Sequence, residues 1–199
     1  MRNAGYGTVL LAGALMTSGV VAWGQKTTLE QPAATSFEIA ISYDASRTNV
    51  ISGNSFWMQG GSVQMHGQFW HGLGVVADVG GLHTNSIHNS GVGLDMVTAT
   101  FGPRYTWSLR SARYSLFGQA LAGEANGINS IFPGVSQAPS TANGLAVQLG
   151  GGMNLNLKPH FAIRAFEADW LRTQLPNSTT SVQNSFRLGA GIVFLFRKN

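Results

Sequence analysis

The chain has 199 residues, which is enough for one domain of ordinary size. Only 10% of them are charged, against about a quarter in a typical soluble domain, and 26 are glycine, a composition that fits a membrane β-barrel better than a soluble enzyme. No cysteine is present, which excludes structural disulfides and thiolate metal sites, and the 12 Lys and Arg residues are too scattered to suggest nucleic-acid binding.

Residues 1–24 are predicted to be a secretory signal peptide. Arg2 supplies the positive charge at its start, and the apolar run Val9–Val21 follows. Ala22-Trp23-Gly24 fits a small-x-small cleavage site, so the signal peptide is expected to be removed after the glycine. The apolar run is too short for a transmembrane helix. Residues 25–35 are polar and contain a proline, which indicates a flexible lead-in.

Beyond residue 36 the chain repeats the period of a β-strand. The last stretch is the clearest, because alternate residues from Phe186 to Phe196 are apolar and the residues between them include Arg187 and two glycines. Segments rich in turn-forming residues separate the similar stretches before it. Because Pro103 cannot donate a backbone hydrogen bond, we predict a local bulge in the fourth stretch. The predicted strands are 36–47, 57–69, 73–83, 93–107, 113–125, 144–157, 161–172 and 183–197.

The connections between these strands alternate in length. Those after the odd-numbered strands are long, and those after the even-numbered strands are short. This alternation, with an even strand count, is typical of outer-membrane barrels, whose periplasmic turns are short and whose extracellular loops are long. The sequence therefore predicts an all-β fold over residues 36–197, an eight-stranded antiparallel up-and-down transmembrane β-barrel. The longest predicted loop is Asn126–Asn143, which is also the most apolar and the best candidate contact surface.

A soluble barrel of the lipocalin type is the competing fold, and it would place apolar residues inside and polar residues outside. The polar row of the predicted strands decides between the two. Its charges are few and of both signs, and glycines are interspersed among them, whereas a solvent-facing row is normally dense in Lys and Glu. The membrane barrel is therefore favoured. The row contains Glu38, Gln64, Asp78, Arg104, Gln148, Asn154 and Arg187.

Charged residues are predicted to point into the narrow interior, where each must be paired because burial of a lone charge is costly. Glu38, Asp78, Arg104, Arg164 and Arg187 form this set. The simpler interpretation is a structural network that fills the lumen, and the alternative is a gate in a very narrow pore.

Strict alternation in the seventh predicted strand conflicts with this arrangement. If Arg164 points inward, Glu167 and Asp169 would face lipid. We therefore predict a bulge near residues 165–167 that turns both carboxylates inward and adds them to the lumen network. The other possibility is that both carboxylates lie above the apolar band, among the lipid headgroups.

Aromatic residues gather near the ends of the predicted strands. This distribution is typical of the aromatic girdles that mark the two membrane interfaces of a barrel. The predicted girdle residues are Tyr43, Trp57, Trp70, Tyr105, Trp107, Trp170, Phe194 and Phe196.

Two short stretches carry a resemblance to a known family. At Gly102-Pro103-Arg104-Tyr105, and at Ala162-Ile163-Arg164 followed by Asp169-Trp170, the chain resembles the small bacterial outer-membrane β-barrel family with an OmpA-like eight-stranded domain, over about residues 36–197. The resemblance implies a monomer in the outer membrane of a Gram-negative bacterium, in contact with outer-membrane lipid and lipopolysaccharide. It also implies recognition of the C-terminal strand by the barrel assembly machinery, although Arg197-Lys198-Asn199 follow the terminal aromatic Phe196.

The function expected from these observations is structural or surface-interacting, with the lumen plugged by polar and charged side chains. A narrow pore for small solutes is the alternative, and a lipid-modifying enzyme is the third possibility. His83, Ser86, His88 and Asp44 are the only catalytic set that can be assembled, and no motif connects them. No catalytic residue, cofactor or metal site is predicted.

Overall fold

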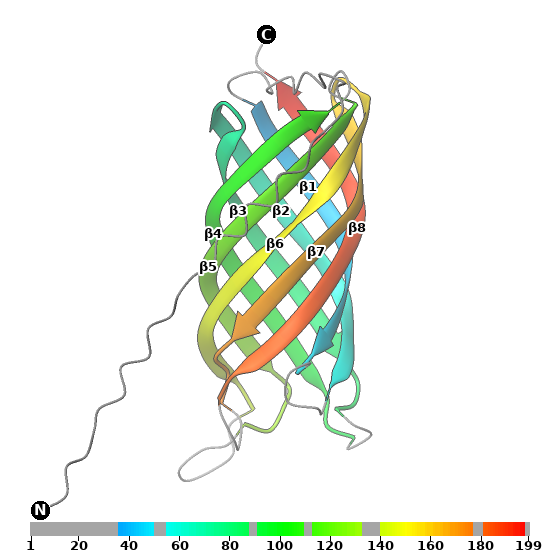
Figure 1. Ribbon diagram of the computed structural model, residues 1–199. Helices are drawn as coiled ribbons and strands as arrows, with labels where there is room; N and C mark the ends of the chain where they lie inside the picture. Colours follow the sequence, from blue (N-terminus) through cyan, green and yellow to red (C-terminus); the bar gives the residue numbers. More distant parts are fainter. Residues whose placement is uncertain are drawn as a thin grey trace, which may run out of the picture.

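The computed structural model describes residues 36–49, 55–87, 91–109, 113–132, 140–176 and 181–197, so the expected signal peptide and lead-in lie outside the described residues. The described residues confirm the predicted fold class. Their strands close into one barrel in which each strand pairs antiparallel with the next and β8 returns to β1 (Figure 1). The strands are β1 (Ser36–Thr48), β2 (Phe56–Trp70), β3 (Leu73–Thr84), β4 (Leu94–Leu109), β5 (Tyr114–Ile128), β6 (Ala142–Lys158), β7 (Phe161–Thr173) and β8 (Gln183–Arg197). In this part of the chain no helix is long and apolar enough to cross a membrane.

The two ends of the barrel differ. The short connections β2–β3, β4–β5 and β6–β7 lie at one end, together with the start of β1 and the end of β8; we call this the turn end, and it is uppermost in Figure 1. The long connections lie at the opposite end, the loop end. The β2–β3 turn needs a glycine because Gly72 has a φ of 89°, and a Cβ there would collide with the Thr106 carbonyl oxygen. That carbonyl belongs to β4, the strand that pairs with β3.

Side chains alternate across the barrel wall, with apolar residues outside and polar residues inside at the centre. On β4, for example, Val97 and Phe101 are exposed, whereas Thr98 and Thr100 between them are buried. A lipocalin-type barrel has the opposite arrangement. The outward apolar residues include Ile41, Val63, Met65, Val75, Val79, Leu149, Ile163, Leu188 and Ile192.

The structure corrects two details. The predicted bulge at Pro103 is wrong: Pro103 pairs with Val75 of β3, and the β4–β5 pairing skips Gly102 and Pro103 without a change of register. The missing N–H of Pro103 therefore interrupts the pairing of β4 with β5 but does not shift the register of the two strands. The predicted loop 126–143 is also too long, because Asn126 pairs with Asn143 across extended β5 and β6, leaving 129–141 as the connection.

The bulge expected in β7 is present. Arg164 pairs with Gly191 of β8 and Glu167 pairs with Gly189, so the register shifts by one residue between them. Ala165 and Phe166 both face outward as a result. One extra outward residue thus restores the inward phase for the carboxylates that follow.

The barrel interior has three zones. A cluster of buried apolar side chains fills the loop end, and we call it the apolar plug. A smaller apolar cluster, Ala40, Ala162, Val193 and Leu195, lies at the turn end. Charged and amide side chains occupy the zone between them. The apolar plug consists of Met58, Leu82, Leu94, Met96, Ala125, Phe132, Ala146, Leu171 and Leu175.

Candidate functional site

Three arginines carry the positive charge of the central zone. Arg104, Arg164 and Arg187 are 1%, 0% and 2% exposed and come from β4, β7 and β8. A guanidinium can be buried this far only if carboxylates and hydrogen-bond acceptors surround it. The arrangement of those acceptors therefore determines what the interior can do.

Arg187 is surrounded by carboxylates. Its Nη2 donates to Asp78 Oδ2 at 2.7 Å and to Asp169 Oδ2 at 3.0 Å, and its Nη1 lies 4.0 Å from Asp44 Oδ2. These carboxylates come from β3, β7 and β1, so one side chain of β8 ties together strands on several sides of the barrel. Asp44 is 2% exposed and was absent from the predicted network.

Gln64 joins the two parts of the network. Its Oε1 accepts hydrogen bonds from Arg104 and from Arg164 Nη1, the latter at 2.5 Å. Its Nε2 donates to Asp78 Oδ2 at 2.9 Å and to Glu167 Oε1 at 2.6 Å. Glu167 also accepts from Arg164 Nη1 at 2.7 Å. The network is therefore continuous across the lumen.

An aromatic ring supports the other two arginines. The guanidinium carbons of Arg104 and Arg164 lie 4.3 and 4.7 Å from the centroid of the Phe117 ring, within cation–π range. Arg104 Nε also donates to Gln119 Oε1 at 3.0 Å, and Arg164 Nε donates to Asn154 Oδ1 at 3.2 Å. The ring takes the place of further carboxylates that these two like charges would otherwise need.

Glu38 also faces the interior but takes no part in this network's hydrogen bonds. Its Oε2 lies 3.3 Å from His66 Nδ1, between β1 and β2 near the turn end. All seven residues predicted for the lumen thus point inward, and six of them share one connected network.

Inward glycines make room for the network. A Cβ added at Gly150 would collide with Asp169 Oδ1, and one at Gly189 would collide with Asp44 Oδ1. A Cβ at Gly152 would lie 2.8 Å from Phe117 Cζ. An eight-stranded barrel has little interior space, so small residues must face the large ones.

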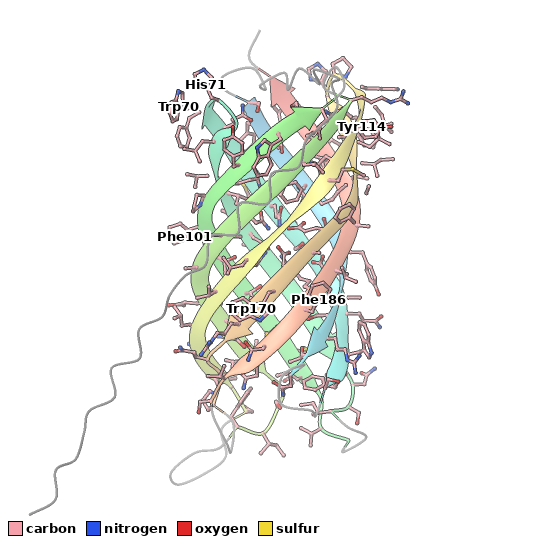
Figure 2. The ribbon with its side chains drawn as sticks, viewed as in Figure 1. Trp70, His71, Phe101, Tyr114, Trp170 and Phe186 are labelled. Carbon is pink, nitrogen blue, oxygen red and sulfur yellow. The ribbon has the colours of Figure 1, made fainter. Side chains whose placement is uncertain are left out.

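The predicted girdle residues lie on the outer wall in two groups. Trp70, Tyr105, Trp107, Phe194 and Phe196 lie towards the turn end, and Tyr43, Trp57 and Trp170 lie nearer the loop end. Figure 2 shows Trp70 and Trp170 at these opposite levels. The Tyr105 and Trp107 rings pack edge to face at 4.7 Å. The outer wall is therefore apolar between two aromatic levels.

A cavity of about 230 Å³ opens at the loop end, on the outer side of the apolar plug. We call it the mouth pocket. Phe132, from the β5–β6 connection, is only 6% exposed and forms part of its wall, whereas its neighbour Ile131 is 66% exposed. The remaining lining residues are Thr48, Asn49, Phe56, Ile87, Leu94, Met96, Ser130, Thr173, Leu175, Pro176 and Gln183.

No protein-family description matches the chain, and no curated protein matches it. Solved structures do. Neisserial surface protein A superimposes with a TM-score of 0.61 and 12% identity, covering 80% of this chain and 97% of that one. Ail, the attachment invasion locus protein of Yersinia pestis, gives a TM-score of 0.53 and 18% identity, covering 82% and 99%. The chain has the fold of the small eight-stranded outer-membrane β-barrels.

In outer-membrane barrels of this size side chains fill most of the interior. In this chain apolar side chains fill the two ends of the interior, and charged and amide side chains fill its centre. Sequence alternation identified the inward face of most strands, left the faces of the fifth less distinct, and missed Asp44, His66 and Phe117 as partners of the buried charges. The signal for Phe117 was present, because it shares a face with Gln119 on β5. Nothing in a single strand shows which residues meet across the barrel.

The only catalytic set assembled from the sequence is not brought together. Asp44 lies inside this outer-membrane barrel, whereas His83 is on its outer wall, and His88 lies outside the described residues. Instead, Asp95 Oδ1 lies 2.5 Å from His83 Nδ1, and Asn85 Oδ1 lies 2.9 Å from Nε2. Both ring nitrogens are therefore occupied. Among the described residues no group of three His, Asp or Glu side chains is placed to hold a metal ion.

Proposed function

We propose that this protein is an integral outer-membrane protein that forms a closed, monomeric barrel and acts through its external loop end. The observation that carries the proposal is the continuous arginine–carboxylate network, with the apolar plug between this network and the loop end. Together they leave the lumen filled at two successive levels. Such an interior stabilises the barrel and leaves the exposed connections as the surface for interaction.

The membrane location is supported by the outer wall. On β3 the outward residues from Leu73 to Gly81 carry no charge, and His83 is the first polar side chain beyond them. Nine residues match the length of about 9–11 that a tilted transmembrane strand needs. Outer-membrane lipid and lipopolysaccharide would contact this band. The barrel assembly machinery would act on β8, after removal of residues 1–24.

Fractionation of cells tests the location. We expect the protein in the outer-membrane fraction, with a gel mobility that changes only when the sample is boiled in SDS, and with an N-terminal sequence beginning at Gln25. A soluble periplasmic protein with no change on boiling would contradict the membrane location. A different N-terminus would contradict only the cleavage site.

Conductance in planar bilayers tests the closed lumen. The wild-type protein is expected to give no discrete current steps, and Arg104→Ala is expected to behave in the same way because the apolar plug remains. Discrete steps from the wild-type barrel would reject the closed barrel. Larger steps from Arg104→Ala or Arg187→Ala would further identify the network as the barrier of a pore.

A narrow pore is the second candidate, and one observation favours it. The buried hydroxyls of Ser42, Ser46 and Thr100 have no hydrogen-bond partner among the described residues. Buried polar groups of this kind commonly bind internal water. Water bound beside the network would mark the path of such a pore, and the same recordings separate this candidate from the closed barrel.

We also propose that the protein is not an enzyme. His83 is held between Asp95 and Asn85, so neither of its ring nitrogens is placed against a serine or threonine hydroxyl that it could activate as a nucleophile. Replacing His83 by alanine is expected to leave the lipid A and phospholipid composition of the cells unchanged. A change in either composition would support the lipid-modifying alternative.

A further inference from the structure

The mouth pocket is built from apolar side chains that come from both strands and connections. Leu94 and Met96 of β4, Phe56 of β2, and Phe132 and Leu175 from the connections enclose it. Four of these five residues also belong to the apolar plug, and the fifth, Phe56, packs against it, so the floor is apolar too. A solute entering from the loop end therefore meets a floor and walls that are mainly apolar.

Three of the polar side chains that line the pocket are already hydrogen-bonded within the protein. Gln183 accepts from the Leu175 backbone N–H at 3.1 Å and donates to the Leu175 carbonyl at 3.0 Å, while the Thr173 hydroxyl donates to Gln183 at 3.2 Å. The Thr48 hydroxyl accepts from Ser185 at 3.2 Å. None of the described residues that line the pocket is charged. These hydrogen bonds fix the walls and leave little capacity to bind an ion or a sugar.

The size of the pocket limits its occupant. An apolar cavity of about 150 Å³ stays dry in proteins and binds benzene. The mouth pocket, at about 230 Å³, is moderately larger. Its volume and chemistry therefore suit one substituted aromatic ring or a short alkyl chain of similar bulk, and not a lipid with several chains.

We propose that the loop end of this barrel is a binding site for a small neutral apolar molecule of the bulk of one substituted aromatic ring. The molecule enters from outside and goes no further, because the apolar plug and the arginine–carboxylate network lie between the pocket and the turn end. The site thus receives a ligand without transporting it. This inference deepens the proposed function and rests on it for the closed barrel below the pocket.

The test is a binding measurement on the purified full-length mature protein in lipid nanodiscs, with para-fluorotoluene as the probe and fluorine NMR as the readout. Nanodiscs without protein give the partition of the probe into lipid. Leu94→Trp fills the pocket from β4, and Val97→Trp is its matched control, because Val97 faces outward from the same strand. A change in gel mobility on boiling shows that each variant is folded.

We expect saturable binding to the wild-type protein and to Val97→Trp. In Leu94→Trp the affinity is expected to fall by about tenfold or more, which corresponds to about 1.4 kcal/mol, because the indole occupies the space of the probe. The absence of saturable binding to the wild-type protein would overturn the proposal, as would equal affinities in the two tryptophan variants. Occupation of the pocket by residues of the chain itself would give the first of these results.

A second variant keeps the test decisive if Leu94→Trp does not fold. Phe132→Ala enlarges the pocket, so it is expected to bind fluoronaphthalene at least about tenfold more tightly than the wild-type protein does. An unchanged affinity for the larger probe would place binding elsewhere and reject the proposal. Because bilayer conductance tests the closed barrel separately, failure of the binding site and failure of the proposed function give different results.

Discussion

Arg187 shows how one residue can decide the stability of a whole interior. It is the common partner of Asp44, Asp78 and Asp169, all of which are buried. Without the guanidinium these carboxylates would face one another in a medium of low polarity. The importance of a buried ion pair is therefore best measured as the loss of stability when one member is removed and the other stays buried without a partner.

Replacement of Arg187 by methionine is expected to lower the free energy of unfolding by about 3–5 kcal/mol, because it leaves buried carboxylates uncompensated. Urea titration in lipid vesicles, followed by tryptophan fluorescence, measures the change. Arg172→Met is the matched control, because Arg172 lies on the exposed face of β7. Its expected effect is within about 0.5 kcal/mol. Equal losses in the two variants would show that Arg187 has no special role.

The inward glycines give a second expectation at this scale. Gly150→Ala is expected to destabilise the barrel by about 1–3 kcal/mol, because the new methyl group collides with Asp169 and with the neighbouring backbone. Gly81→Ala is the control, since a Cβ there meets nothing within 4 Å. The same urea titration compares the two. A harmless Gly150→Ala would mean that the network has spare room.

At the scale of the element, β7 carries a mid-strand bulge that decides where its charged residues point. Its extra residue changes the phase of the strand between Arg164 and Glu167, and the pairing with both β6 and β8 shifts at that point. Without the shift, either the arginine or the carboxylates would face lipid. The bulge is therefore a device that matches an irregular sequence to a regular wall.

Deletion of Ala165 is expected to be tolerated. It makes Arg164 and Phe166 neighbours, which restores regular alternation and a continuous register with both adjacent strands. Deletion of Ala168 is the matched comparison, because it reverses the phase of Asp169 relative to Glu167 and forces a charged side chain towards lipid. Refolding into lipid, scored by the shift in gel mobility on boiling, distinguishes the two. Failure of both deletions, or success of both, would show that phase is not what the bulge controls.

At the scale of the whole molecule, the outer wall and the interior have opposite polarity. Phe101 lies at mid-height on the outer wall (Figure 2). His83 lies near the loop end of the neighbouring strand, β3. Phe101→Arg is expected to destabilise the membrane-inserted barrel by about 2–4 kcal/mol, and His83→Arg by about 0–1 kcal/mol, because the cost of a charge depends on its depth in lipid. Unfolding titrations in vesicles measure both. A similar small cost at both positions would indicate that Phe101 does not face lipid.

Much of this architecture follows from the sequence alone, because period-two alternation assigns each residue to a face. It placed Arg104, Arg164 and Arg187 inside and required a phase change in β7. Alternation does not show which inward residues meet, because contacts across the lumen depend on the stagger of strands far apart in the sequence. The inward position of Phe117 could be inferred from Gln119 on the same face, but its contact with two arginines could not be predicted for this reason. Phe132 could not be placed either, since a loop has no period.

The pairing of β1 with β8 has a consequence for how the chain folds. Ser36 is paired with Arg197, and Thr48 with Ser185, so the first strand cannot be completed until the last one arrives. Contacts so distant in sequence make folding slow and leave two open sheet edges that invite aggregation. The ion pairs of Arg187 with Asp44 of β1 and Asp78 of β3 depend on the same step, whereas Asp169 already faces Arg187 across the β7–β8 hairpin. Closure of the barrel and neutralisation of Asp44 and Asp78 are therefore coupled, and the open sheet edges stay exposed to aggregation until both are complete.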